Sequence, residues 1–419
     1  MKKALILGYG ISGKACYDVL KEDYSVYVYD DKKIDGIKQI SKGELENELP
    51  LFDLTIRSPG FNIHSEIFSL VSLLSKEVIS EIELGYRYLK NRNVDIIAVT
   101  GSNGKTTVVT LIGELLKSIN KKYYLLGNIG TPLISKVKDI EEGSTVVLEL
   151  SSFQLENIKE FTFNIAIITN ITPNHLDHVP NYSYYVGSKK KLLQNINNQI
   201  VLTNGNSYLK EYKRNTINIY DNKIVYYKKD KLYYIDKIIV KKEELTNQSG
   251  YILEDISYAL LGVVLLYGFN KNYISAIKNF SGVKYRQEVL KVGNTIFIND
   301  GKSTTVDSLN NAMQLYKRNK RIIILGGIYK SEGIENTKFK RDDLLLIYGR
   351  DSNIIKDKTK RGLIFNTLNE ALSYLITLDL EQKVIIYSPS CSSLDQYSSY
   401  IERSKEFENF IKEHFYVSK

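Results

Sequence analysis

The 419-residue sequence contains no tryptophan, only two cysteines, four histidines and six prolines. Two cysteines, Cys16 and Cys391, can form neither a disulfide framework nor a four-cysteine zinc site, and so low a count is typical of a reducing compartment. The longest apolar run, residues 258–269, is shorter than the ~20 residues of a membrane-spanning helix. The apolar run near the start, residues 4–7, is shorter than the ~7–15 residues of a secretory signal. We therefore expect a cytoplasmic protein without a membrane segment.

Charge and composition are close to those of ordinary globular proteins. Hydrophobic residues make up 43% of the chain and charged residues 25%, which excludes wholesale disorder. The formal net charge of +9 would suit an anionic ligand or a nucleic acid. However, lysine and tyrosine are abundant throughout, and no basic block of the kind found in nucleic-acid-binding arms stands out. We expect no nucleic-acid partner.

Short apolar runs alternate with longer segments of helical periodicity, and this pattern predicts parallel α/β layers. Between residues 217 and 240, alternating tyrosine- and lysine-rich segments indicate antiparallel hairpins in a small sheet. Polar stretches near Asn91 and Ser281 precede new strands, so we expect three domains, at residues 1–91, 92–281 and 282–419. The expected strands are residues 4–7, 26–29, 54–57, 96–100, 123–126, 146–150, 165–169, 200–203, 295–299, 322–325, 344–348 and 384–387.

The first candidate site is the glycine-rich segment GYGISG at residues 8–13, directly after an expected strand. Glycines there permit a tight turn and a close approach of phosphate to the backbone, at the start of a helix. The next strand ends at Asp30 and Asp31, about twenty residues on, where a carboxylate often binds a ribose hydroxyl. The pattern favours a nucleotide diphosphate, although a purely structural glycine turn remains an alternative.

A second nucleotide motif, VTGSNGKTT at residues 99–107, lies between an expected strand and an expected helix. Its spacing is slightly shorter than the usual phosphate-loop pattern, because only three residues separate Gly101 from Lys105. In such loops backbone amides surround phosphate, the lysine reaches the outer phosphates and the hydroxyl of the next residue, here Thr106, can hold Mg²⁺. Two nucleotide motifs in one chain argue against a simple dehydrogenase and favour ATP at the second site.

Polar residues follow several strands near this loop. Asn128 lies in GNIG, Glu149 in LELSSFQLE and His175 in NITPNHLDH. A carboxylate at a strand end beside a phosphate loop is a natural Mg²⁺ ligand, whereas His175 alone could equally be a loop histidine with ordinary hydrogen bonds. Lys189 opens a triplet of lysines, and the residues by themselves favour a solvated helix face for it.

The last third of the sequence has three polar clusters at the ends of expected strands. NDGKST begins at Asn299, a double glycine ends at Gly327, and SPSCSSLDQ begins at Ser388. Clusters at the carboxyl ends of parallel strands line the ligand crevice of an α/β sheet, so one shared site is favoured. Asp300 and Lys302 could also be a simple ion pair. Cys391 lacks an activating histidine cluster, and we interpret it as a packing residue.

With these motifs in order, the sequence resembles the Mur ligases, the ATP-dependent amide-forming enzymes of peptidoglycan precursor synthesis. The matching segments are TGSNGKTT, GNIG, LELSSFQLE, NITPNHLD, NDGKSTT, LGG and SPSCSSLDQY, followed by Tyr400 and Arg403, and they span nearly the whole chain. The resemblance implies an N-terminal Rossmann-like domain for a UDP-sugar, a central phosphate-loop ATPase-like domain, and a C-terminal Rossmann-like domain for an amino acid. Together with RSPGFN at residues 57–62, it implies the ATP-dependent addition of D-glutamate to UDP-N-acetylmuramoyl-L-alanine, a step of cell-wall synthesis that supports cell shape and division.

The resemblance also assigns residues, position by position. For the UDP-sugar it implies Ser12, Asp30, Asp31, Ser58, Asn128 and His175. For ATP it implies Gly101, Ser102, Asn103, Gly104, Lys105, Thr106, Thr107, Arg286 and Asp300. For the incoming amino acid it implies Lys302, Thr304, Lys330, Ser393 and Tyr400. For two Mg²⁺ ions it implies Thr106, Glu149, His175 and a carbamylated Lys189, and for catalysis Lys105, His175, Lys189 and Lys302.

The sequence departs from the family pattern at a few positions. Ile328 and Tyr329 stand where the family often has an aspartate, Tyr400 replaces a phenylalanine, and Ser404 replaces a usual glycine. The segment that contacts adenine in the family has no clear match around residues 254–257. We expect a monomer. Three alternatives remain: another Mur-type or folylpolyglutamate synthase-like ligase, a relative that binds nucleotides without catalysis, and, third, an NAD-dependent dehydrogenase.

Overall fold

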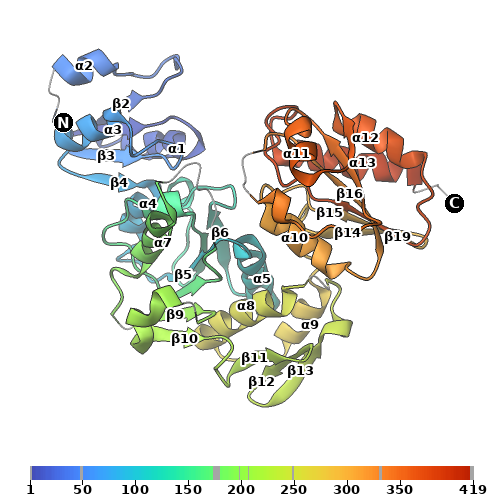
Figure 1. Ribbon diagram of the computed structural model, residues 1–419. Helices are drawn as coiled ribbons and strands as arrows, with labels where there is room; N and C mark the ends of the chain where they lie inside the picture. The colour runs from blue at the N-terminus through green and yellow to red at the C-terminus, as the bar shows by residue number, and fades with distance from the viewer. Residues whose placement is uncertain are drawn as a thin grey trace. The chain divides into compact units, whose positions relative to one another are not determined.

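The computed structural model describes residues 2–47, 51–172, 180–197, 199–205, 207–247, 250–329 and 333–415 (Figure 1). The chain forms two compact units. The first comprises Met1–Thr246 with Ile252–Phe280, and the second comprises Asn247–Tyr251 with Ser281–Lys419. Among the described residues, no helix has both the length and the apolar character that crossing a membrane requires.

The first unit begins with a four-stranded parallel sheet in the order β2-β1-β3-β4. Its strands are β1 (Lys2–Leu7), β2 (Tyr24–Tyr29), β3 (Leu54–Arg57) and β4 (Val78–Ser80). Alternate residues of β1 point to opposite faces of the sheet. Ala4 and Ile6 pack in one core with helix α1 (Ile11–Leu20), whereas Leu5 and Leu7 pack in another with α2 (Lys42–Asn47) and α3 (Glu66–Leu74). Helices thus cover both faces and leave the carboxyl ends of the strands to the loops.

A second, parallel sheet of six strands follows in the order β10-β9-β8-β5-β7-β6. Its strands are β5 (Asp95–Thr100), β6 (Tyr123–Gly127), β7 (Thr145–Glu149), β8 (Ile165–Ile168), β9 (Ile200–Thr203) and β10 (Thr216–Asn218). The helices α5 (Lys105–Ser118) and α8 (Ile252–Tyr267) pack against each other, and α9 (Asn272–Asn279) packs on α5. Gly262 of α8 lies against the side chains of Ile165, Ile167 and Leu202, so α8 covers the β8–β9 part of this face. β5 and its following loop therefore lie in the middle of the sheet.

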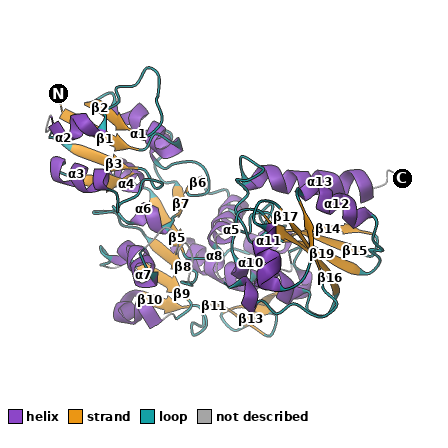
Figure 2. Cartoon of the chain, turned by 45° about the horizontal axis from the view of Figure 1, so that its top comes forward, coloured by secondary structure: helices purple, strands orange, loops and turns teal. Residues whose placement is uncertain are grey.

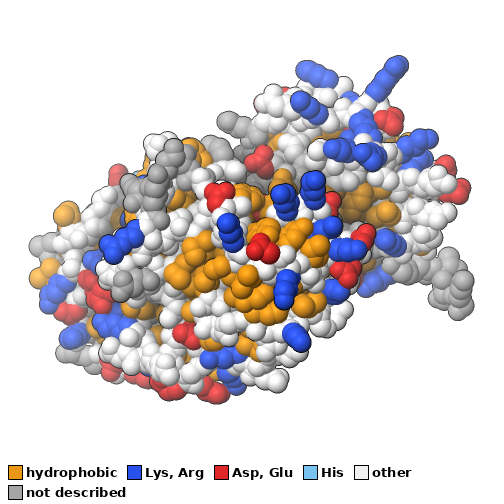
Figure 3. Space-filling view, turned by 90° about the horizontal axis from the view of Figure 1, so that it is seen from below, with side chains coloured by type: hydrophobic (Ala, Val, Ile, Leu, Met, Phe, Trp, Pro, Cys, Tyr) orange, Lys and Arg blue, Asp and Glu red, His pale blue; other side chains and the backbone are white. Residues whose placement is uncertain are grey.

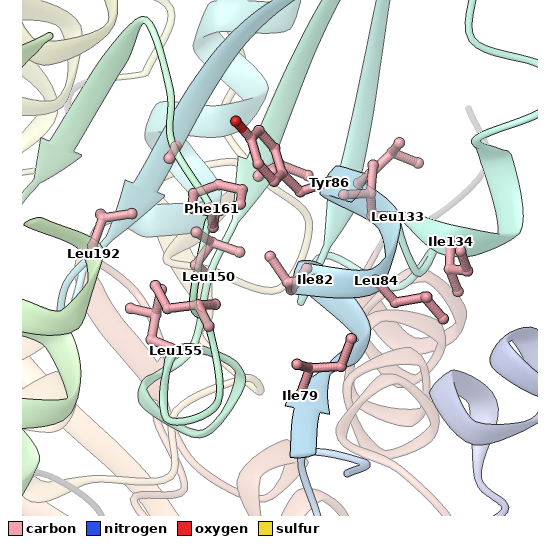
Figure 4. Close-up of a cluster of buried hydrophobic side chains, with 14 of the residues drawn as sticks. Ile79, Ile82, Leu84, Tyr86, Leu133, Ile134, Leu150, Leu155, Phe161 and Leu192 are labelled. Atoms are coloured by element: carbon pink, nitrogen blue, oxygen red, sulfur yellow. The ribbon is translucent and has the colours of Figure 1, made fainter. Parts of the chain in front are cut away.

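One apolar core joins the two sheets of the first unit. Helix α4 (Glu81–Leu89) leads from the first sheet toward β5, and its residues Ile82, Leu84 and Tyr86 are buried with Leu133 and Ile134 of the next layer (Figure 4). The same cluster contains residues of α6 (Ser152–Leu155), α7 (Tyr182–Lys190) and the short 3₁₀ turn at Lys191–Leu193. Because this core continues across the connection near Asn91, the domain boundary at that residue stays a prediction.

The small antiparallel sheet of the first unit has three strands: β11 (Val225–Lys228), β12 (Lys231–Tyr234) and β13 (Lys237–Lys241). The rings of Tyr226 and Tyr233 stack across it, with centroids 4.8 Å apart. Figure 3 shows hydrophobic side chains, with tyrosine counted among them, beside many lysine and arginine side chains on the face seen from below. The sequence prediction of hairpins here is confirmed, but its start at residue 217 is wrong, because Thr216–Asn218 pairs in parallel with β9.

The second unit is built on a six-stranded sheet in the order β14-β15-β19-β16-β17-β18 (Figure 2). Its strands are β14 (Glu288–Val292), β15 (Thr295–Asn299), β16 (Lys320–Gly326), β17 (Leu344–Tyr348), β18 (Leu363–Phe365) and β19 (Lys383–Tyr387), and only β14 is antiparallel. Helices α10 (Val306–Leu315) and α11 (Ser352–Thr359) share one core with the sheet, and α12 (Leu368–Ile376) and α13 (Tyr400–Phe415) share the other. The sheet is therefore covered on both faces.

Every expected strand overlaps a strand of the structure, so the prediction of parallel α/β layers is confirmed. The sequence missed four strands, which are β4, β10, β14 and β18. Each of them lies at the edge of its sheet, and three of them have only three residues. Short edge strands carry little apolar periodicity, which is why the pattern did not reveal them.

Candidate active site

The loop between β5 and α5 has the geometry of a phosphate-binding loop. Gly101 has a φ of +148°, and a Cβ atom there would lie 2.0 Å from the Thr169 hydroxyl oxygen. Gly104 has a φ of +83° and is the N-cap of α5. Only glycine tolerates both the backbone angle and the contact at Gly101, and the turn leads into the N-terminus of α5, where the first backbone amides of a helix have no acceptor within the helix itself. This end of α5 favours an anion such as phosphate.

Residues after β8 hold this loop in place. The Asn103 amide donates a hydrogen bond of 2.9 Å to Asn170 Oδ1, and the Asn170 side-chain amide donates one of 3.1 Å to the Asn103 carbonyl oxygen. The Ser102 hydroxyl donates to the Thr172 carbonyl oxygen at 2.9 Å. Lys105 Nζ donates to the carbonyl oxygens of Gly101 and Ser102 at 2.9 and 3.0 Å. These side-chain hydrogen bonds thus fix the loop without a bound phosphate, and the ammonium group of Lys105 lies against the loop carbonyl oxygens.

Lys189 is buried against the same loop, with 1% of its surface exposed. Its Nζ donates to the Gly101 carbonyl oxygen at 2.9 Å and lies 4.7 Å from the centre of the Tyr185 ring. Burial, and secondarily the charge of Lys105, hold the pKa of Lys189 well below its usual range. A lowered pKa means that more of the amine is neutral and nucleophilic near neutral pH.

The lysine triplet does not form one solvated face, so that expectation from the residues alone is wrong for Lys189. Lys190 Nζ lies 5.9 Å from the centre of the Tyr212 ring, and Lys191 Nζ contacts the Glu156 carbonyl oxygen. Successive residues of a helix point about 100° apart, so only one of the three can reach Gly101. The structure directs Lys189, and neither neighbour, to the phosphate loop.

Asn128 and Glu149 meet at the ends of the neighbouring strands β6 and β7. The Asn128 side-chain amide donates to Glu149 Oε1 at 2.9 Å, and its backbone amide donates to the Glu149 carbonyl oxygen at 2.8 Å. Gly127 has a φ of +91°, and a Cβ atom there would lie 2.4 Å from the Glu149 carbonyl oxygen. Glu149 is buried. His175, the third member of the expected group, lies outside the described residues.

A cavity of about 680 Å³ brings several groups of the central sheet together, although Thr106 and Glu149 do not line it. Lys105, Lys189 and Asn128 line it, as do Gly101 and Tyr185. On its other side lie residues of the loop that follows β3, namely Pro59, Gly60, Phe61, Asn62, Ile63 and His64. Two lysines and an amide in one cavity can bind and neutralise an anionic group.

The glycine-rich turn after β1 borders a second cavity, of about 440 Å³. All four residues expected at the UDP-sugar's nucleotide line it: Ser12, Asp30, Asp31 and Ser58. Asp30 Oδ2 accepts the Tyr9 amide at 2.7 Å, and the Ser58 hydroxyl donates to the Gly8 carbonyl oxygen at 2.7 Å. Asp30 and Ser58 therefore also shape the turn.

The three polar clusters of the second unit lie side by side, as predicted, because β15, β19 and β16 are neighbouring parallel strands. Asp300 follows β15 and is buried. Its Oδ2 accepts the Ser388 hydroxyl at 2.8 Å, and its Oδ1 accepts the Gln287 amide at 3.2 Å. Burial raises the pKa of Asp300 to about 7, while the Ser388 hydrogen bond and the charge of Arg286 act in the opposite direction. The hydrogen bonds from Ser388 and Gln287 thus hold the Asp300 carboxylate in place.

Several residues expected at the amino acid are found near these strand ends. Lys302 Nζ lies 5.4 Å from the centre of the Tyr400 ring, Thr304 is exposed, and the carbonyl oxygen of buried Ser393 accepts the Tyr397 amide. Lys330 lies outside the described residues. Cys391 is fully buried in the core beside α10, and burial raises its thiol pKa to about 12, which agrees with a packing role.

Arg403, which follows the last family motif in the sequence, organises the loops of the second unit. It is fully buried in α13, and its guanidinium donates to the carbonyl oxygens of Gly301, Ser303 and Cys391 at 3.1, 3.0 and 2.9 Å. It therefore ties the loop after β15 to the loop after β19. Arg403 lies four residues before Phe407, on the apolar face of the helix. This spacing is the sequence signal that could have revealed the burial of Arg403.

Comparisons with known proteins cover nearly the whole chain. A family model described as the Mur ligase middle domain matches residues 99–277. A UDP-N-acetylmuramoylalanine–D-glutamate ligase of Caldicellulosiruptor saccharolyticus is 31% identical, over 98% of this chain and 99% of that protein. A ligase of the same name from Francisella philomiragia is 30% identical, over 99% of this chain and 97% of that protein.

Solved structures share the fold at lower identity. The MurF ligase of Thermotoga maritima, solved in complex with ADP, superposes with a TM-score of 0.66 at 14% identity, over 99% of this chain and 96% of that one. The UDP-N-acetylmuramate-alanine ligase of the same organism gives a TM-score of 0.60 at 17% identity, over 99% of this chain and 100% of that one. The fold is therefore that of the Mur ligases.

Proposed function

This chain belongs to the Mur ligase family, and from that membership we propose that it joins D-glutamate to UDP-N-acetylmuramoyl-L-alanine with consumption of ATP. The full-length similarity to two D-glutamate ligases supports this choice of amino acid over those of other family members. The step supplies a peptidoglycan precursor in the cytoplasm, on which cell shape and division depend. We propose that the enzyme works as a monomer, on three small substrates.

The two cavities of the first unit suggest how the nucleotides are allocated. The UDP-sugar takes the cavity bordered by Ser12 and Asp30, and its muramoyl-alanyl end reaches Asn128 and His175. ATP takes the phosphate loop, where backbone amides and Lys105 bind its phosphates. Arg286 and Asp300 bind the rest of ATP, and Lys302, Thr304, Lys330, Ser393 and Tyr400 bind D-glutamate.

The side chains near the phosphate loop suit Mg²⁺. The hydroxyl of Thr106, at the start of α5, and the carboxylate of Glu149 are hard oxygen donors of the kind Mg²⁺ prefers. Within the described ranges, no three acidic, cysteine or histidine side chains gather into a metal site, so phosphate oxygens and a carbamate on Lys189 would complete the ligand sets, with His175. Two bound Mg²⁺ ions would neutralise phosphate charge.

The residues support a two-step reaction. A carboxylate resists attack by an amine because its charge repels the nucleophile. Transfer of the ATP γ-phosphoryl group to the L-alanyl carboxylate gives an acyl phosphate, and the D-glutamate amine then displaces phosphate through a tetrahedral intermediate. Lys105 stabilises the charge of the transferring phosphoryl group, and Lys302 holds the amino acid's carboxylate. Exclusion of water during this step would protect the acyl phosphate from hydrolysis.

The observation that carries this proposal is the convergence of Lys105, Lys189 and Asn128 on one cavity at a phosphate loop. Its test uses UDP-N-acetylmuramoyl-L-alanine labelled with ¹⁸O in the alanyl carboxylate. With ATP and D-glutamate, one labelled oxygen should leave with the inorganic phosphate, which mass spectrometry detects. Unlabelled phosphate would mean that water, and no substrate carboxylate, accepts the phosphoryl group.

A further inference from the structure

The loop that follows β3 forms a wall of both cavities in the first unit. Pro59, Gly60 and Phe61 line the 440 Å³ cavity at the glycine-rich turn and the 680 Å³ cavity at the phosphate loop. If the UDP-sugar is the substrate, as proposed above, it must run along this loop from one cavity to the other. The position of these three residues therefore decides how well the substrate fits.

Arg57, the last residue of β3, lines the 680 Å³ cavity together with Glu156, and its guanidinium also bonds this loop. Its Nε donates to the Phe61 carbonyl oxygen at 2.9 Å, and its Nη1 donates to the Phe153 carbonyl oxygen at 3.0 Å. The same Nη1 lies 2.7 Å from Glu156 Oε2 and donates to Asn157 Oδ1 at 3.1 Å. The guanidinium thus connects the loop Pro59–Phe61, called the substrate loop below, to residues 152–157, called the α6 segment. This segment follows Glu149 in the chain.

The Arg57–Glu156 pair is almost completely withdrawn from water, since the side chains are 2% and 3% exposed. A planar guanidinium can bond several acceptors at once in a fixed geometry, which a lysine ammonium on a flexible chain cannot reproduce. A buried ion pair is by itself weak support for stability, because desolvation offsets most of the attraction. The bonds to the Phe61 and Phe153 carbonyl oxygens indicate that this pair has a second role.

We propose that Arg57 is a positioning residue for the UDP-sugar: it fixes the Pro59–Phe61 wall against the α6 segment and so sets the affinity for this substrate. The role that we propose for Arg57 involves the substrate loop and not the phosphate loop. Replacement of Arg57 should therefore weaken binding of the UDP-sugar and leave the KM for ATP unchanged.

The second unit provides a matched control. Arg321 and Asp343 form an ion pair that is equally buried, with 3% and 0% exposure. Arg321 Nε donates to Asp343 Oδ1 at 2.8 Å, and its Nη1 donates to the Met313 carbonyl oxygen at 2.8 Å. Neither residue lines the two cavities described above. Arg321→Met removes the same kind of buried pair without touching the substrate loop.

The experiment compares Arg57→Lys, Arg57→Met, the double variant Arg57→Met/Glu156→Leu and Arg321→Met in the full chain. Calorimetry gives the Kd of UDP-N-acetylmuramoyl-L-alanine, steady-state assays give both KM values, and thermal unfolding gives Tm. Arg57→Lys keeps a positive charge beside Glu156 and should fold, with the Kd raised about tenfold. Arg57→Met should raise the Kd about 10²-fold, because it removes the charge and every hydrogen bond from the guanidinium to the loop. Arg321→Met should lower Tm but leave Kd within twofold.

The double variant separates positioning from charge compensation. It leaves no uncompensated charge, so Tm should recover, but the Kd should stay high because the bonds to Phe61 and Phe153 are still missing. Recovery of the wild-type Kd in the double variant would overturn the proposal, as would an unchanged Kd in Arg57→Lys. The proposed function is judged separately, from turnover of the wild-type enzyme with D-glutamate.

Discussion

The two regions that we propose bind ligands are built in opposite ways. At the phosphate loop of the first unit, Lys105 and Lys189 both donate a hydrogen bond to the carbonyl oxygen of Gly101 and line one cavity. At the strand ends of the second unit, the buried ionic groups Asp300 and Arg403 bond to the loops themselves. In the first region the charged groups face a cavity, whereas in the second they fix loops of the scaffold, in addition to the contact with ATP that we propose for Asp300.

This difference predicts which property, turnover or stability, each kind of substitution should change. Loss of a lysine at the phosphate loop should remove transition-state stabilisation and leave the fold intact. Loss of a buried group in the second unit should change stability, or its dependence on pH, before it changes chemistry. The predictions below test this contrast, beginning with the largest expected effect.

Lys105→Ala should abolish ATP-dependent turnover, with a loss of about 10²–10³-fold or more, because it removes the charged donor of the phosphate loop. The helix α5 should still form, since Gly101 and Gly104 shape the loop. ADP formation at saturating ATP measures the effect, and circular dichroism controls for the fold. Near-normal turnover by a folded Lys105→Ala enzyme would contradict the assignment of this loop to the active site.

Lys189→Ala should lose about 10²-fold or more in turnover and should be partly rescued by short carboxylates, which can occupy the place of a carbamate. Lys190→Ala and Lys191→Ala are the matched controls and should remain active, because their ammonium groups point to Tyr212 and to Glu156. If Lys190→Ala alone were inactive, or if all three variants kept full activity, the carbamate assignment would be wrong.

Asp300→Asn should change how stability depends on pH. Burial raises the pKa of Asp300 to about 7, so between about pH 4 and pH 7 the folded protein holds a proton that the unfolded chain releases. The contribution of the Asp300 carboxyl group to the free energy of unfolding is therefore largest at low pH and is lost as the pH rises through 7. Asparagine resembles the protonated form and does not titrate.

Urea unfolding at pH 5 and pH 7 measures this effect. Relative to the wild type, Asp300→Asn should gain about 2 kcal/mol between the two pH values. A difference between variant and wild type that is the same at both pH values would show that Asp300 titrates normally.

Ser12→Ala or Asp30→Ala should raise the KM for the UDP-sugar about tenfold and leave the KM for ATP unchanged, as is expected for a lost hydrogen bond to a charged or polar ligand group. Both residues line the cavity at the glycine-rich turn. Initial rates with one substrate varied at a time measure the two constants. A rise in the KM for ATP instead would reverse the allocation of the two nucleotides.

The same contrast explains how much could be predicted from the sequence. The phosphate loop and the glycine-rich turn follow from short-range requirements, because Gly101 and Gly104 must adopt positive φ angles within a few residues of one another. The long, buried strands follow from apolar runs. These features were predicted with the correct boundaries to within a few residues.

Contacts between residues that are far apart in the sequence could not be predicted from short-range patterns. The burial of Lys189 depends on the end of β5 and the loop after it, and the role of Arg403 depends on a loop about a hundred residues earlier in the chain. The Arg57–Glu156 pair likewise joins residues that are far apart in the sequence. Lysines and arginines in amphipathic helices usually face solvent, so only the packing of distant elements identifies the exceptions.

The most direct measurement of the proposed activity is ADP formation with UDP-N-acetylmuramoyl-L-alanine, ATP and Mg²⁺ as single amino acids are added. D-Glutamate should trigger ADP formation, and mass spectrometry should find the UDP-sugar heavier by one glutamyl residue. L-Glutamate, L-alanine and L-lysine should leave ADP at the background rate. Turnover with one of these amino acids and none with D-glutamate would contradict the proposed specificity, and no turnover with any of them would contradict the proposed reaction.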